Sequence, residues 1–225
     1  MRKGIKPISV GHLVDIASFI EKAQQIGFIA CHSASRLAVV AAMNNMMTLH
    51  PFGETDRGAV QQFEARVEAT DEGGLWVQYI VDIAAEDVFL PDDAPPERTD
   101  DLWKTTCFEL FVRRAGKPGY IEFNFSPSSR WAAYHFSDYR NCVSNLPMEE
   151  APAIHMDFGD YWFSVETNVT LPPNWVGISL EANLTAVIES SDGKLGYWAV
   201  KHAIEKPDFH HPDCFVLSVT APARP

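Results

Sequence analysis

The stretch 103–136 constrains the fold more than any other, because two short segments within it alternate with period two. Residues 107–113 read Cys-Phe-Glu-Leu-Phe-Val-Arg, and residues 120–125 read Tyr-Ile-Glu-Phe-Asn-Phe. Between them, residues 114–119 hold two glycines and a proline, which favour a tight turn. The pattern therefore predicts a β-hairpin inside a β-meander.

The register of this hairpin decides which side chains share a face. If Arg113 lies opposite Tyr120, one face is wholly apolar, and a slip of one residue would divide the apolar set between two faces. The apolar face then carries Phe108, Leu110, Val112, Ile121, Phe123 and Phe125, and the other carries Glu109, Phe111, Tyr120, Glu122 and Asn124. Because the chain has too few helical patterns to cover such an apolar face, we expect an all-β fold: an antiparallel two-sheet β-sandwich, similar to a jelly roll.

The whole chain divides into an N-terminal extension, 1–45, and a sandwich domain, 46–225, which includes the hairpin and has nine or ten predicted strands. The extension holds five basic and two acidic residues, a net charge of +3. Since the whole chain carries −12, the remainder carries −15. An apolar stripe at Leu13, Ile16, Ala17 and Ile20 predicts a short helix in the extension. Two alternatives remain for this segment: it is a secretory signal, or it is a leader that is not translated.

The composition excludes several classes of partner. The formal net charge of −12 and the pI near 5.0 would repel phosphate backbones, and no basic cluster offsets them, so we predict no nucleic-acid partner. No apolar run approaches the roughly eighteen residues of a membrane span, so we predict a soluble protein without a membrane partner. The four cysteines form no Cys-x-x-Cys pair, which, with the lack of a clear export signal, favours a cytoplasmic location.

Three short segments together resemble a known family. They are Asp-Asp-Leu-Trp at 100–103 followed by Glu-Leu-Phe at 109–111, Ile-Glu-Phe-Asn at 121–124 followed by Ser-Pro-Ser, and Pro-Asp-Phe-His-His-Pro at 207–212. Over about residues 50–220 the chain resembles the DOMON-like proteins, which are similar to the family 9 carbohydrate-binding modules. The resemblance implies a sandwich or jelly roll. It also implies a ligand site, since sugar-binding relatives clasp a sugar with aromatic side chains, some with structural calcium, and other relatives hold haem.

A sugar presents apolar C–H patches and a rim of hydroxyl groups, so its site needs flat aromatic rings beside hydrogen-bonding groups. The chain supplies both kinds of residue around 100–140, after a long polar loop at 89–101 that is a candidate wall of a site. The predicted ligand-binding residues are Trp103, Glu109, Asn124, Arg130, Trp131, Tyr139 and Trp198. We therefore predict a carbohydrate-binding protein with no catalytic residue, no cofactor and no metal.

Alternatives stay open at several of these positions. Any tryptophan of a sandwich can belong to the core, and Glu109 and Glu122 could be read as a glycosidase pair, although no nucleophile motif accompanies them. The segment around His202, Asp208, His210, His211 and Asp213 could hold a metal, or form a structural turn with Phe209 as an apolar plug and Asp208 or His210 bonded to backbone groups. A haem- or metal-binding sandwich and a protein-interaction domain without a small ligand are the alternative functions.

Overall fold

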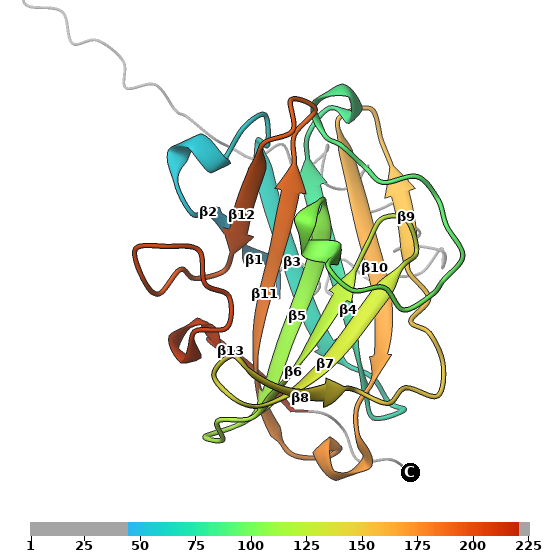
Figure 1. Cartoon of the computed structure of the whole chain (residues 1–225), viewed down its shortest axis with the longest axis vertical. Coiled ribbons are helices and arrows are strands. Elements are labelled where there is room, and N and C mark those ends of the chain that lie inside the picture. Colours follow the sequence, from blue (N-terminus) through green and yellow to red (C-terminus); the bar gives the residue numbers. More distant parts are fainter. Residues whose placement is uncertain (1–44, 221–225) are drawn as a thin grey trace, which may run out of the picture. The chain divides into compact units, whose positions relative to one another are not determined.

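The structure, a computed structural model, describes residues 45–220, which form two antiparallel sheets packed face to face (Figure 1). In spatial order, sheet A consists of β1 (Met47–Thr48), β3 (Gln62–Ala69), β4 (Gly74–Asp82), β10 (Trp162–Thr170) and β9 (His155–Phe158). Sheet B consists of β2 (His50–Pro51), β12 (Leu195–Ala199), β11 (Ser179–Glu189), β5 (Cys107–Arg114), β6 (Tyr120–Phe125), β7 (Trp131–Asp138) and β8 (Asn141–Asn145), with β13 (Leu217–Thr220) also paired to β11. The predicted all-β sandwich is confirmed.

Helices play a small part in the described residues. They are the 3-10 helices η1 (Glu54–Asp56), η2 (Ala85–Asp87), η3 (Leu102–Lys104), η4 (Pro173–Trp175) and η5 (Pro212–Cys214). The predicted N-terminal helix lies outside the described residues. Within residues 45–220, no helix is long and apolar enough to span a lipid bilayer.

The central hairpin has the predicted register. Arg113 of β5 lies opposite Tyr120 of β6, Phe111 opposite Glu122, and Glu109 opposite Asn124. The six apolar side chains of the inner face are all fully buried in the main core between the sheets. The alternation therefore predicted correctly which face of the meander points inward.

The inner face of sheet B packs on the alternate side chains of β4. The inward positions of β4 are Leu75, Val77, Tyr79 and Val81, each at most 1% exposed, as the period-two pattern of this segment predicts. The hydroxyl of Tyr79 crosses the core and donates a hydrogen bond of 2.7 Å to the backbone carbonyl of Glu109. This bond ties the two sheets together directly beneath the outer face of β5.

The structure holds thirteen strands among the described residues, more than the nine or ten predicted. Two of the additional strands, β1 and β2, are only two residues long, too short to show an alternating pattern. The strand β8 follows the turn at Tyr139 and Arg140, and all five of its residues are exposed, so it lacks the apolar alternation by which strands are recognised.

Candidate functional site

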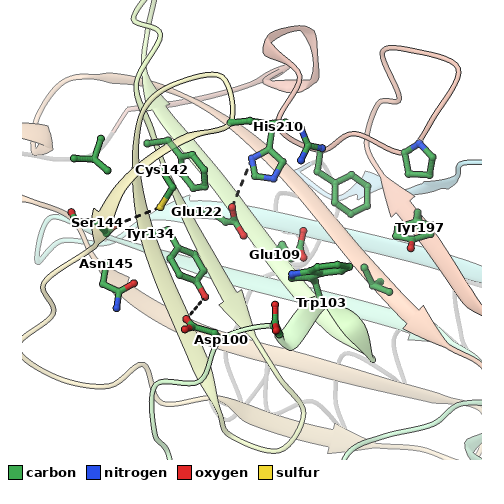
Figure 2. Close-up of a pocket in the computed structure, with 17 residues that line it drawn as sticks. Asp100, Trp103, Glu109, Glu122, Tyr134, Cys142, Ser144, Asn145, Tyr197 and His210 are labelled. Atoms are coloured by element: carbon green, nitrogen blue, oxygen red, sulfur yellow. Dashed lines mark hydrogen bonds and ion pairs between the residues drawn. The ribbon is translucent and has the colours of Figure 1, made fainter.

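A pocket of about 690 Å³ opens on the outer face of sheet B. Its floor contains the carboxyl groups of Glu109 and Glu122, and aromatic side chains stand around it, among them Trp103, Tyr134 and Tyr197 (Figure 2). The lining comes from parts of the chain that are far apart in sequence, from the loop at Asp100 to the loop that contains His210. It is therefore a product of the tertiary fold.

The pairing of sheet B builds the floor in rows. One outward row runs from Asn124 through Glu109 to Thr185, and the next runs from Tyr134 through Glu122 to Phe111. Glu109 and Glu122 are thus diagonal neighbours on adjacent strands, a relation that places Cα atoms about 7–8 Å apart. Two carboxyl groups consequently share one sheet face, directly under the pocket.

A short anchored turn places Trp103 above this floor. Asp101 has a left-handed backbone, with φ of 65°, a conformation that aspartate tolerates better than most residues. After it, the side chain of Leu102 is buried against Cys107 and Ala132, and the Nζ of Lys104 lies 2.7 Å from a carboxylate oxygen of Asp101. Because both neighbours of Trp103 are held, its indole projects from η3 and is 45% exposed.

A second wall is formed by Tyr134 of β7 and by β8. The hydroxyl of Tyr134 donates a hydrogen bond of 2.7 Å to a carboxylate oxygen of Asp100, which joins β7 to the loop before η3. Burial, followed by the neighbouring carboxylate of Asp100, raises the pKa of Tyr134, so its hydroxyl keeps its proton near neutral pH. Ser144 and Asn145 of β8 add hydroxyl and amide groups to this side of the pocket.

The segment 205–214 is held against the pocket by a buried aspartate. The carboxylate of Asp208 accepts a hydrogen bond of 2.7 Å from Nη2 of Arg140 and another from the hydroxyl of Tyr139, both in the turn between β7 and β8. Burial opposes ionisation of Asp208, but these two bonds outweigh it and hold the pKa of Asp208 below its ordinary value. The clamp keeps Phe209 and His210 at the edge of the pocket.

The two floor carboxyl groups resist ionisation. Burial raises the pKa of Glu122 to about 7, although the hydrogen bond from Asn124 and the charge of Arg140 act in the opposite direction. Burial and the charge of Glu122 raise the pKa of Glu109 well above its ordinary value. Burial and the neighbouring Arg140 lower the pKa of His210 to about 4, so this imidazole is neutral near pH 7 and gives no positive charge to the pair.

Four of the seven predicted ligand-binding residues lie at or beside this pocket. Trp103 and Glu109 line it. Asn124 lies under the floor, where its Nδ2 donates a hydrogen bond of 2.7 Å to Oε1 of Glu122. Tyr139 lines a smaller adjoining pocket of about 310 Å³, and its hydroxyl is already bonded to Asp208.

The other three predicted residues do not line the pocket. Trp131 and Trp198 are 7% and 1% exposed, in the core between the sheets. The reason is register, because both belong to a single inward row across sheet B. In this row Trp131 pairs with Phe125, Phe125 with Phe108, Phe108 with Ala186 and Ala186 with Trp198. Arg130 precedes β7, and its Nη2 lies 3.3 Å from Oε1 of Glu97.

Several pocket residues were missed as ligand-binding candidates. Tyr197 precedes Trp198 on β12, and the two side chains point to opposite faces. Because Tyr197 pairs with Val187, and Val187 with Cys107, it belongs to an outward row and reaches the pocket. The alternation of side chains along β12 could have shown that Tyr197 and Trp198 face opposite sides of the sheet. The sequence alone did not show which of the two faces outward. Tyr134 was visible on the predicted meander, opposite Glu122.

The histidine-containing segment forms a structural turn in which Phe209 is buried, as expected. Its side chains bond to other side chains and not to the backbone groups expected. The carboxylate of Asp208 accepts hydrogen bonds from Tyr139 and Arg140, and Nδ1 of His210 lies 2.8 Å from the hydroxyl of Tyr120. In residues 45–220, no three His, Cys, Asp or Glu side chains are arranged to hold a metal ion.

Comparison with known proteins relates the chain to solved structures only, since no family model and no curated protein matches it. A proposed carbohydrate-binding protein from Bacteroides uniformis ATCC 8492 aligns with a TM-score of 0.60 and 13% identity, over 85% of this chain and 94% of that one. A family 9 carbohydrate-binding module from Caldicellulosiruptor kristjanssonii, solved with cellotriose and with glucose, aligns at 10% identity and a TM-score of 0.45, over 73% of this chain and 76% and 78% of those chains. The first similarity is one of fold.

Proposed function

We propose that this protein binds a carbohydrate, without chemical conversion, in the pocket on the outer face of sheet B. The observation that carries the proposal is the exposed indole of Trp103 beside a floor of buried carboxyl groups. A pyranose ring can stack its C–H face on an indole while its hydroxyl groups reach polar groups at the other side. Glu109 and Glu122 are available for those hydroxyl groups, and Tyr197 widens the aromatic wall.

The description of the protein from Bacteroides uniformis supports this reading, since its fold extends over most of both chains. We also propose that the chain is a relative of the DOMON-like proteins and of the family 9 carbohydrate-binding modules. The support is the resemblance in sequence segments, because a shared fold does not by itself imply a shared function. The sequence segments that carry this resemblance include Asp100, Asp101 and Trp103, and all three line the pocket. A carbohydrate site at this position is consistent with that resemblance.

Electrostatics favour binding over hydrolysis. A glycosidase uses two carboxyl groups with different tasks, so one must be ionised while the other keeps its proton. Here burial raises the pKa of both Glu109 and Glu122, and both belong to the same buried floor. Among the described residues, no Lys or Arg side chain is paired with either group at hydrogen-bond distance, so no cation fixes one of them as the carboxylate of such a pair.

The proposal is tested by isothermal titration of the full chain with a panel of neutral mono- and disaccharides. We expect saturable binding to at least one sugar, and we expect Trp103→Ala to weaken that binding about tenfold or more, because the stacking surface is removed. The free energy of unfolding of Trp103→Ala should stay within about 1 kcal/mol of the parent, since this side chain is half exposed.

Tyr161→Ala is the matched control, because Tyr161 is an aromatic residue with 74% exposure that lies outside the pocket. Its affinity for the sugar should equal that of the parent. Saturable binding that both variants retain would place the carbohydrate elsewhere on the molecule. Absence of binding by the whole panel, and by an amino sugar titrated beside it, would overturn the proposal.

A further inference from the structure

Each floor carboxyl group has one oxygen without a hydrogen-bond donor among the described residues. Oε2 of Glu109 accepts a bond of 3.1 Å from Thr185, and Oε1 of Glu122 accepts one of 2.7 Å from Asn124. Oε2 of Glu122 lies 3.8 Å from Nδ1 of His210, beyond hydrogen-bond distance, and that nitrogen is already 2.8 Å from the hydroxyl of Tyr120. The exposed fractions of Glu109 and Glu122 are only 3% and 7%, so both are almost cut off from bulk water while they face the pocket.

The surroundings of this pair contain no free cation among the described residues. The guanidinium group of Arg140 lines the pocket, but it is bonded to the buried carboxylate of Asp208. Lys104 is paired with Asp101 at the rim. The titratable or charged groups around Glu122 and the pocket come from every element packed against it. They are Glu109 and Cys107 on β5, Tyr120 on β6, Tyr134 on β7, Arg140 in the turn after β7, Cys142 on β8, Tyr197 on β12, Asp100 and Asp101 before η3, and Asp208 and His210 in the segment before η5. Acidic groups are in excess.

We propose that the ligand of this pocket is a polyhydroxylated amine, of which an amino sugar is the simplest kind, and that Glu109 and Glu122 bind its ammonium group. The inference rests on the proposed function, because it assigns the chemical class of the ligand to the same pocket. An ammonium group offers three donors and no acceptor, which matches two carboxyl groups that each have an oxygen to spare. Hydrogen bonds between ionised partners are about twice as strong as those between neutral groups.

The proton balance follows from the state of the free pair. Burial raises the pKa of Glu122 to about 7 and that of Glu109 well above its ordinary value, so the empty pocket carries bound protons near neutral pH. A bound cation favours the ionised form of both groups, and the displaced protons pass to the buffer. Binding of the protonated amine should therefore release protons, and its affinity should rise as the pH approaches about 7 from below, the range in which the amine itself stays protonated.

The test compares three probes on the full chain by calorimetric titration: glucosamine, glucose and N-acetylglucosamine. Glucosamine and N-acetylglucosamine differ in charge at a single nitrogen, so the pair isolates the ammonium group. At neutral pH we expect glucosamine to bind at least about tenfold more tightly than either neutral sugar, the effect of charge-assisted hydrogen bonds to two largely buried carboxyl groups. Titration in two buffers of different ionisation enthalpy should show proton release for glucosamine alone.

Glu122→Gln and Glu109→Gln keep the shape of the floor, and each prevents one floor group from becoming a carboxylate when the amine binds. In both variants the ratio of the glucosamine and glucose affinities should fall toward one. Glu86→Gln is the matched control, since Glu86 is exposed in η2 and remote from the pocket lining, and its ratio should equal that of the parent. Thermal unfolding of each variant verifies that the sandwich is intact.

The outcomes separate this inference from the proposed function. Equal affinities for glucosamine and glucose, or tighter binding of glucose, would overturn the inference and leave carbohydrate binding in place. A preference for glucosamine that survives both glutamine substitutions would also overturn it, because the ammonium group would then bind elsewhere. Failure of all three probes and of the neutral-sugar panel would overturn both.

Discussion

The two faces of the β5–β6 hairpin come from the same twelve or so residues and have opposite properties. The inner face is wholly apolar and packs against sheet A, with every side chain at 0% exposure. The outer face is just as hidden, since Glu109, Phe111 and Glu122 are at most 7% exposed, yet it carries ionisable groups. Burial alone therefore does not define the core of this molecule, because one buried face is wholly apolar and the other carries ionisable groups.

The two faces also differ in how they are covered. A continuous second sheet covers the inner face, whereas separate pieces of chain cover the outer one: η3, β8 and the segment with Phe209 and His210. Separate pieces leave space between them, and that space is the pocket. Substitutions on the packed inner face and on the pocket-bearing outer face should therefore have different effects.

The largest effect should come from a tryptophan on the packed face. Trp198→Ala removes a side chain that is 1% exposed and lies beside Phe63, with ring centroids 5.5 Å apart. The cavity left behind should lower the free energy of unfolding by about 3–5 kcal/mol, measured by urea denaturation. Trp103→Ala on the other face is the comparison, with a small loss of stability and a large loss of binding. Similar stabilities for the two variants would contradict the assignment of Trp198 to the core.

A pH-dependent effect is expected on the site-bearing face. The pKa of Glu122 is raised from 4.5 to about 7 on folding, so the folded state holds this proton more tightly than the unfolded state. This carboxyl group therefore lowers stability progressively as the pH rises from about 4.5 to about 7, by on the order of 3 kcal/mol in total. Glu122→Gln should be more stable than the parent above this window and equal to it below.

The measurement is the free energy of unfolding of parent and variant at several pH values. Glu86→Gln serves as the control, because Glu86 is exposed and its stability difference from the parent should not vary over the same window. A Glu122→Gln variant that is less stable than the parent above pH 7 would show that the buried carboxyl group is stabilised by a partner, contrary to the raised pKa.

A loss of stability smaller than that of Trp198→Ala is expected at the clamp formed by Asp208, Tyr139 and Arg140 beside the pocket. Asp208→Asn replaces a carboxylate that accepts hydrogen bonds from Tyr139 and Arg140, and it should lower stability by about 2 kcal/mol near neutral pH. Because folding lowers the pKa of Asp208, the parent gains this stability above the ordinary pKa and loses it as the pH falls through the lower folded value. Parent and variant should thus converge in acid, which chemical denaturation at two pH values would reveal.

The fold was predictable where alternation was strong. The register of β5 and β6, the inward face of β4 and the existence of a second sheet all follow from period-two patterns in segments with large apolar residues. Strand β8 was not predictable, because an exposed edge strand has no buried face to mark it. Its place in the pocket wall was hidden for the same reason.

The arrangement of the candidate site was predictable in part. Glu109 and Asn124 were placed on the polar face of the hairpin because its register followed from the sequence, and the structure has that register. Trp103 was chosen as an aromatic residue within the region of the family resemblance, and it lines the pocket. Trp131 and Trp198 were assigned by type and neighbourhood, without their register. The pairing of β11 with both β5 and β12 aligns Trp198 with Ala186 and Phe108, on the inward side.

The alternation of residue types along the strands was enough to predict the sandwich and the apolar and polar faces of the hairpin, because side-chain parity along a strand is a local property. Long-range packing sets which face of β12 points to the pocket, and which loops cover Glu109 and Glu122 and so raise their pKa values. The reason is physical: strand order and loop placement depend on contacts between residues far apart in the chain. No local pattern encodes those contacts.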